Sequence, residues 1–321
     1  MVSTAVANWY VMNAQQESLS PYHLTPEQIQ FFDDNGYLVL HNWIPNTLLK
    51  RLQGAADAWI QDGWSRFGEM PASKSWDEDW AFAQREHGKV MYRVNYLHDK
   101  GHAASLELLG SPQVLAVAES LCGKNFVPTY ESMVFKQEGD GEAVKWHQDA
   151  VHPRQYRIFN YDLYLDESLA DSGALRVIPR SQFSKSDPCQ IADDYGWQPP
   201  GVITVEMQPG DVLLHDVMVV HGSPQTEGNK LRRTIYYEFR AAEEILDEGP
   251  WDREWIDRRL RLLPVALRSH TRAYPQAAQF QWNISDEFRP DTGEDDEIEL
   301  KVAHQVHMSG AWCSAGDAVK K

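Results

Sequence analysis

The stretch Trp146-His147-Gln148-Asp149-Ala150 decides how this chain is read, because it places a histidine and an aspartate two residues apart. In an extended strand, side chains two residues apart point to the same face, so His147 and Asp149 can meet one metal ion. A second histidine, His221, follows far downstream in Val219-Val220-His221-Gly222-Ser223. Two histidines and one carboxylate form the facial triad that suits non-haem Fe(II) and leaves coordination positions open. The sequence therefore predicts an iron site of His147, Asp149 and His221.

Two other histidines compete for the place of the third ligand. His215 comes four residues after Asp211, where a strand begins, and His152 stands beside Pro153 in a loop. We interpret His215 as a histidine that supports the site, and His152 as a loop residue. A histidine and an aspartate at this spacing would be weak evidence alone, since the chain has 12 histidines and 47 acidic residues.

The surrounding sequence supplies the fold class. From Asn125 to Arg240, short runs rich in Val, Ile, Tyr and Phe alternate with turn residues such as those in Gly210-Asp211. This pattern predicts a mainly β fold with flanking helices, built as a double-stranded β-helix, which is a jelly-roll barrel of two antiparallel sheets.

These motifs together resemble the phytanoyl-CoA dioxygenase family of Fe(II)- and 2-oxoglutarate-dependent oxygenases. The resemblance runs from about Leu24 to about Arg240. The segment from Leu24 to Leu40 resembles the family's N-terminal helix and strand. The segment from Ser172 to Ser181 resembles its central motif, with Arg180 where glycine is commoner.

The resemblance implies an enzyme that uses Fe(II), 2-oxoglutarate and O2 to oxidise, most simply to hydroxylate, a C–H bond of a small organic molecule, with release of succinate and CO2. Desaturation and ring formation stay open as alternatives on the same scaffold. The intact Asp149 argues against halogenation, because related halogenases carry a small residue there. A cupin-type metal enzyme would need a larger histidine set, and a non-catalytic binding module would not need the triad.

An arginine fits the co-substrate. Arg232 follows His221 by 11 residues (232 − 221 = 11) and offers a planar fork for a carboxylate. Strand alternation separates Arg232 from Arg233, which should face the other side. The resemblance places Arg232 on the distal carboxylate of 2-oxoglutarate, with Ser223 as a hydroxyl contact and Arg93 as a further basic contact.

Four more residues are candidates for the wall of the site. Gln148 lies between two expected ligands, so it should point away from the metal and reach the substrate or co-substrate wall. Met133 and Tyr164 are candidate pocket walls, with plain core packing as the equal alternative. Asp162 stands where relatives commonly carry an apolar side chain, and a buried acid needs a partner. That partner is expected to be a basic cofactor contact, a cationic or hydroxylated substrate, or a structural base such as Arg157.

Bulk properties indicate an ordinary enzyme with a small-molecule substrate. The net charge of −17 argues against nucleic acid or an anionic membrane as a partner. The three cysteines are far apart in sequence, which favours a reducing compartment, and no secretory signal is recognised, so we expect a cytoplasmic location. No basic patch for CoA phosphates is recognised, which favours a substrate of specialised metabolism. The oligomeric state is left open.

The chain divides into three parts. Residues 1–22 are expected to be a flexible leader, and residues 23–270 a single oxygenase domain. Residues 271–321 are expected to form a C-terminal extension, and the sequence leaves open whether it packs on the domain. Helices are predicted from Pro26 to Asp34, from Pro45 to Asp62 and from Pro112 to Gly123. Residues 63–88 lack periodicity and are expected to form a lid-like or a partly helical insertion. Trp76 and Trp80 are expected to cover the site and limit unproductive turnover, with core packing as the equal alternative.

Overall fold

The computed structural model describes residues 20–68, 78–86, 88–136, 142–152, 155–184, 186–225, 231–291 and 299–304, and the backbone of 311–312. No helix within these ranges is long and apolar enough to cross a membrane. The α-helices are α1 (Pro26–Asn35), α2 (Asn46–Phe67), α3 (Ala103–Leu109), α4 (Pro112–Cys122), α5 (Pro188–Tyr195), α6 (Ala242–Glu248), α7 (Arg253–Leu260) and α8 (Leu262–Ala273). The strands are β1 (Tyr37–Leu40), β2 (Trp80–Arg85), β3 (Gly88–Asn95), β4 (Phe126–Lys136), β5 (Val144–Gln148), β6 (Phe159–Tyr164), β7 (Leu175–Ile178), β8 (Ile203–Val205), β9 (Val212–Asp216), β10 (Val220–Ser223), β11 (Arg232–Ala241) and β12 (Ala311–Trp312).

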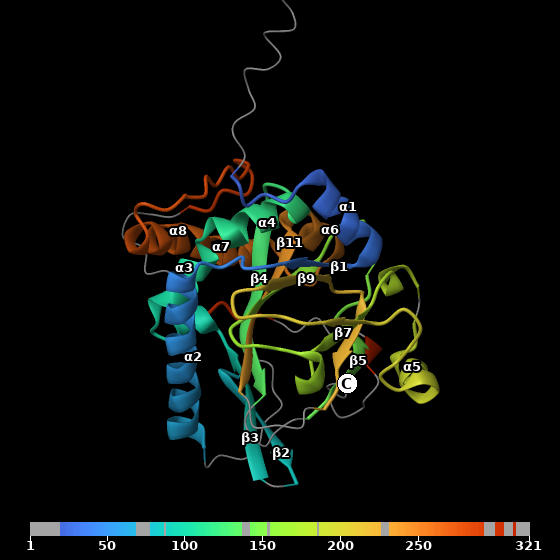
Figure 1. The fold of residues 1–321 in the computed structure, drawn as a ribbon. Helices are drawn as coiled ribbons and strands as arrows, with labels where there is room; N and C mark the ends of the chain where they lie inside the picture. The colour runs from blue at the N-terminus through green and yellow to red at the C-terminus, as the bar shows by residue number, and fades with distance from the viewer. Residues whose placement is uncertain are drawn as a thin grey trace, which may run out of the picture.

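The described strands form two antiparallel sheets that face each other. The larger sheet has seven strands in the order β1-β9-β6-β11-β4-β3-β2, and the smaller has five in the order β12-β5-β10-β7-β8. Figure 1 shows β5 and β7 on one side of β4 and β11, with α2 and α3 on the other. The architecture confirms the predicted jelly roll with flanking helices, although the two sheets are not joined into a closed barrel.

Strand register fixes which face of the large sheet meets which layer. Ile235 lies opposite Met133 on one side and Leu163 on the other, and all three belong to the main core with the helices. Tyr164 points the other way and packs with Val177 of the small sheet. The face that carries Tyr164 is therefore the inner face, between the two sheets.

The N-terminal helices follow the sequence signals at their starts. In α1, Thr25 accepts a hydrogen bond from the Gln28 backbone, Pro26 occupies the first turn, and Gly36 ends the helix with a positive φ. The predicted end of α2 at Asp62 is wrong, because the helix continues to Phe67. Gly63 does not stop it: a Cβ there would lie 2.3 Å from Trp80, so glycine allows close packing.

The expected insertion at residues 63–88 begins and ends in regular structure. It contains the last turn of α2 and strand β2, which pairs with β3. Trp80 is buried, and its indole nitrogen donates to the Trp59 carbonyl at 3.0 Å. Residues 69–77, with Trp76, and residue 87 lie outside the described residues. The role as a lid stays a prediction.

The chain ends are tied to the domain where they are described. Of the expected leader, residues 1–19 lie outside the described residues, while Tyr22 packs edge-on against Trp43. In the C-terminal extension, Phe280 and Phe288 join the main core, and β12 pairs with β5. The extension therefore contributes to the core and to the edge of the small sheet.

Candidate metal centre

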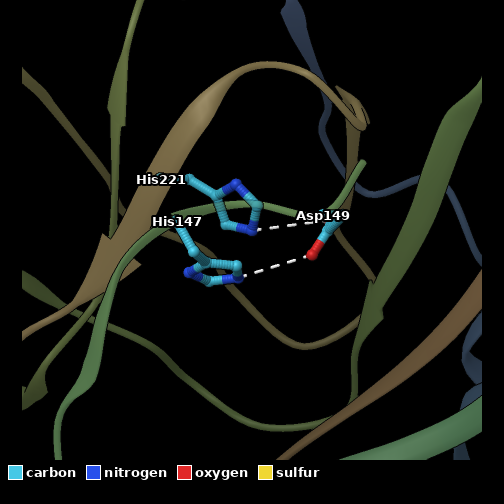
Figure 2. Close-up of side chains that lie close together, drawn as sticks. All are labelled: His147, Asp149 and His221. Atoms are coloured by element: carbon cyan, nitrogen blue, oxygen red, sulfur yellow. Dashed lines mark ion pairs between the residues drawn. The ribbon is translucent and has the colours of Figure 1, made fainter. Parts of the chain in front are cut away.

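The predicted iron ligands meet between the two sheets. His147 on β5 and His221 on β10 are directly opposite each other in neighbouring strands, and Asp149 follows the end of β5. One ligand atom from each side chain lies within 4.8 Å of the others, the only such group in the described part of the chain. Figure 2 shows both imidazoles directed toward the carboxylate, with His147 Nε2 3.4 Å from Asp149 Oδ1 and His221 Nε2 3.8 Å from Oδ2.

Backbone carbonyls orient both histidines. The Nδ1 atom of His147 donates to the Lys145 carbonyl at 2.7 Å, and that of His221 donates to the Val219 carbonyl at 3.0 Å. Because Nδ1 carries the proton in each ring, Nε2 keeps its lone pair on the side that faces Asp149. Both rings are thus held in the form that binds a metal.

The charges of the cluster also suit a metal ion. Burial opposes the ionised form of Asp149, but His221 and His147 together hold its pKa well below the usual value. Burial, with His147 next, lowers the pKa of His221 to about 3. An ionised carboxylate and neutral imidazoles are the forms that ligate metals. The donor set of two nitrogens and one oxygen fits Fe(II).

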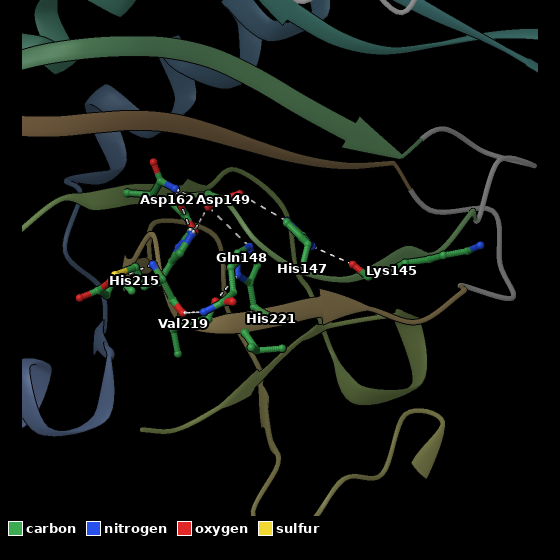
Figure 3. A network of polar contacts seen from close by, with 12 residues as sticks. Lys145, His147, Gln148, Asp149, Asp162, His215, Val219 and His221 are labelled. Atoms are coloured by element: carbon green, nitrogen blue, oxygen red, sulfur yellow. Dashed lines mark hydrogen bonds and ion pairs between the residues drawn. The ribbon is translucent and has the colours of Figure 1, made fainter. Parts of the chain in front are cut away.

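Two further side chains contact the carboxylate, and one of them was missed by sequence analysis. Asn160 on β6 donates from Nδ2 to Asp149 Oδ2 at 2.8 Å, and His215 Nε2 lies 3.1 Å from the same oxygen. Figure 3 shows His215 between Asp149 and Asp162. His215 supports Asp149 and does not belong to the ligand group, as predicted. The signal for Asn160 was its alternation with Asp162 and Tyr164 on one strand.

The partner of Asp162 is His215. Its Oδ2 lies 2.8 Å from His215 Nδ1, and both side chains are buried. The alternative partner Arg157 is wrong, because Arg157 pairs with Asp33 at 2.6 Å. Burial raises the pKa of Asp162. Burial opposes a charge on His215, but Asp162 and then Asp149 raise the pKa of His215 to about 10. Because both pKa values are raised, the Asp162–His215 pair keeps a proton at neutral pH.

The expected co-substrate contacts come from both sheets, with Arg232 at the start of β11 and Ser223 at the end of β10. Arg232 donates to the Gly173 carbonyl and, at 3.2 Å, to the Ser168 hydroxyl. The Ser223 hydroxyl is buried and has no hydrogen-bond partner among the described residues. Burial and then Asp162 raise the pKa of Tyr236, while Arg232 acts against them, so Arg232 lies within electrostatic range of the site. A partly exposed guanidinium and an unsatisfied buried hydroxyl fit a carboxylate ligand.

The neighbouring arginine faces the other way, as alternation predicts. Arg233 is buried and pairs with Asp166 at 2.8 Å and with Asp57 of α2. It is therefore held outside the inner face by two structural carboxylates.

Arg93 and Tyr164 stand in one row across the inner face. Arg93 lies opposite Val134 of β4, which lies opposite Thr234 of β11, which in turn lies opposite Tyr164 of β6. Arg93 donates to the Tyr130 hydroxyl at 2.7 Å. The position is compatible with a contact to the co-substrate, and that role stays a prediction.

The expected roles of Met133 and Gln148 need correction. Met133 belongs to the core beneath the helices, on the face away from the triad, so core packing is the alternative that holds. Gln148 points away from the metal as expected, but its amide donates to the Met218 carbonyl and is fully enclosed. It ties β5 to the loop before β10 and does not reach a co-substrate.

We expect Gln148→Leu to lower the free energy of unfolding by about 1–2 kcal/mol, because the Met218 carbonyl would be left buried without its donor. The affinity for 2-oxoglutarate should stay within about twofold of the wild type when both proteins carry the same amount of bound metal, since the amide faces away from the triad. Denaturant unfolding and ligand titration measure the two effects. If the variant were as stable as the wild type but bound 2-oxoglutarate weakly, Gln148 would be a co-substrate contact after all.

Comparisons with known proteins agree with this geometry. The model of the family described as Phytanoyl-CoA dioxygenase (PhyH) matches residues 32–234, more than half of the chain. The methylphosphonate hydroxylase of Gimesia maris is 26% identical over 234 residues, which cover 69% of this chain and 82% of that protein. The solved structure of EvdMO1 is 27% identical with a TM-score of 0.57, and the match covers 67% of this chain and 50% of that one. The structure of EctD from S. alaskensis with 2-oxoglutarate and 5-hydroxyectoine shares the fold at 20% identity, with a TM-score of 0.55 over 68% of this chain and 77% of that chain.

Proposed function

Because the chain belongs to the phytanoyl-CoA dioxygenase family, we propose that it hydroxylates a C–H bond of a small polar molecule with Fe(II), 2-oxoglutarate and O2. The observation that carries the proposal is the convergence of His147, Asp149 and His221 on one point between the sheets. The chain is a dioxygenase by family, and the intact triad supplies the metal ligands that such chemistry needs.

The residues of the chain divide the work. His147, Asp149 and His221 would hold the iron, which with 2-oxoglutarate and O2 supplies the oxidising power and yields succinate and CO2. Arg232 and Ser223 would bind the distal carboxylate of 2-oxoglutarate and direct its 2-oxo acid end toward the triad. The apolar cluster that includes Val177, Leu213 and Val219 keeps water from that part of the inner face.

The substrate class follows from what the inner face leaves accessible. Tyr130 and Tyr236, both partly exposed, bring hydroxyl groups to this face. The partly exposed Glu238 carboxylate is paired with Arg240 at 2.7 Å. Such a wall suits a small molecule that carries hydrogen-bonding groups better than a long acyl chain. The relative named for methylphosphonate points the same way. The wide spacing of the three cysteines in the sequence supports the cytoplasm as the place of action.

We expect Fe(II) and 2-oxoglutarate together to raise the melting temperature. A ligand at about 100 times its dissociation constant adds about 2.7 kcal/mol to the folded state. Thermal unfolding under anaerobic conditions measures the shift, and succinate formed after admission of O2 measures turnover without a known substrate. If the metal-loaded wild type showed no shift in melting temperature and formed no succinate, the proposed function would be refuted.

A further inference from the structure

The two oxygens of the Asp149 carboxylate have different neighbours. Oδ2 lies 2.8 Å from Asn160 Nδ2 and 3.1 Å from His215 Nε2. Oδ1 lies 3.4 Å from Nε2 of His147, one of the metal-binding histidines. Oδ2 therefore has two close nitrogen neighbours from the large sheet, whereas the histidines of the small sheet are further away, with His221 Nε2 3.8 Å from Oδ2 and His147 Nε2 3.4 Å from Oδ1.

This difference matters for the number of open positions on a metal. Each carboxylate oxygen has about two lone-pair sites, so Asn160 and a His215 ring that carries its proton on Nε2 leave Oδ2 little capacity for a metal. His215 Nε2 also lies 3.1 Å from Asn160 Nδ2, so the three groups form one cluster. A carboxylate that binds through one oxygen completes a facial triad and leaves room for a chelating 2-oxo acid and for O2. A carboxylate that binds through both oxygens would take one of those positions.

His215 can serve as a donor only if its ring is held in place, and Asp162 holds it. His215 Nδ1 lies 2.8 Å from Asp162 Oδ2, and each side chain is about 1% exposed. The two atoms are in close contact, although the contact does not meet the geometric criteria of a hydrogen bond. Asn160 and His215 also face each other in register, on β6 and β9, which brings both donors to the same oxygen.

Burying the Asp162–His215 pair costs hydration free energy, which indicates that the pair has a role other than stability. A buried acid and imidazole lose much hydration, and an apolar pair of similar size is often as stable or more stable. The pair lies one contact behind a metal ligand, and partners of this kind fix the orientation of the ligand they touch.

We propose that Asp162 and His215 are positioning residues for Asp149, which with Asn160 occupy Oδ2 so that the metal binds through Oδ1 alone. The inference rests on the proposed function, because it concerns the same metal centre. It predicts a change in metal geometry and co-substrate binding, with the metal itself retained.

The test uses cobalt(II) as the probe, since its visible spectrum reports coordination number. We compare wild type with His215→Phe, Asp162→Leu and the double variant that carries both changes. In all three we expect the cobalt to stay bound, its spectrum to shift, and 2-oxoglutarate to bind about 10- to 100-fold more weakly. His98→Phe is the matched control, because His98 is equally buried but stacks on Tyr237 on the helix-covered face. It should keep the wild-type spectrum and affinity.

Two further comparisons separate positioning from stability. The double variant replaces both polar partners with apolar groups, so it should unfold at a higher temperature than Asp162→Leu while its 2-oxoglutarate affinity stays low. His215→Gln keeps an N–H donor and should recover most of that affinity. Wild-type spectra and affinities in His215→Phe and the double variant, or losses that only follow the melting temperature, would overturn the inference. If the wild type itself bound neither cobalt nor 2-oxoglutarate, the proposed function would fail instead.

Discussion

Replacing His221 with alanine is expected to abolish Fe(II)-dependent succinate formation. The ring of His221 supplies one of three ligand atoms that converge within 4.8 Å, and its Nδ1 is already committed to the Val219 carbonyl. Two remaining ligands cannot complete the facial triad, so His147→Ala and Asp149→Ala should have the same effect. Iron stoichiometry after anaerobic loading and succinate production measure the losses.

The control for this prediction is His215→Ala. His215 touches Asp149 but does not belong to the ligand group, so the variant should retain bound metal. Loss of the metal in His215→Ala together with its retention in His221→Ala would exchange the two assignments. A metal lost in both would mean that the carboxylate cannot hold its place without His215.

The triad could be predicted from sequence because each step depends on local geometry. His147 and Asp149 share a face through the two-residue period of a strand, whatever the rest of the fold does. The same period separates Arg232 from Arg233, and the structure places them on opposite faces, one near the site and one against Asp166. The start of α1 was equally local, since Thr25 and Pro26 carry their own signals.

The support behind the triad could not be predicted, because it depends on register between distant strands. Asn160 and His215 lie opposite each other only through the pairing of β6 with β9, and no local pattern sets that alignment. Asp162 was correctly read as a buried acid in need of a partner, but the same missing register concealed His215. Gln148 shows the same limit, since its acceptor is the backbone of Met218.

A second large effect is expected from Arg232→Ala, which should raise the 2-oxoglutarate concentration needed for half saturation. Loss of a charge-assisted pair with two parallel hydrogen bonds corresponds to about 2–4 kcal/mol of binding free energy. The guanidinium is partly exposed and its described partners are a carbonyl and a hydroxyl, so its removal leaves no buried charge. The free energy of unfolding should therefore change little.

Arg233→Ala should show the opposite pattern, and the contrast makes the prediction specific. Arg233 is buried between Asp166 and Asp57, and its removal leaves Asp166 without its charged partner. Unfolding free energy should fall by about 2–4 kcal/mol, below the upper values for buried pairs because Asp57 is largely exposed. Titration of 2-oxoglutarate into the metal-loaded protein and denaturant unfolding, applied to both variants, give four values. Equal losses of affinity in the two variants would place both arginines on the inner face and would contradict the strand register on which the co-substrate assignment depends.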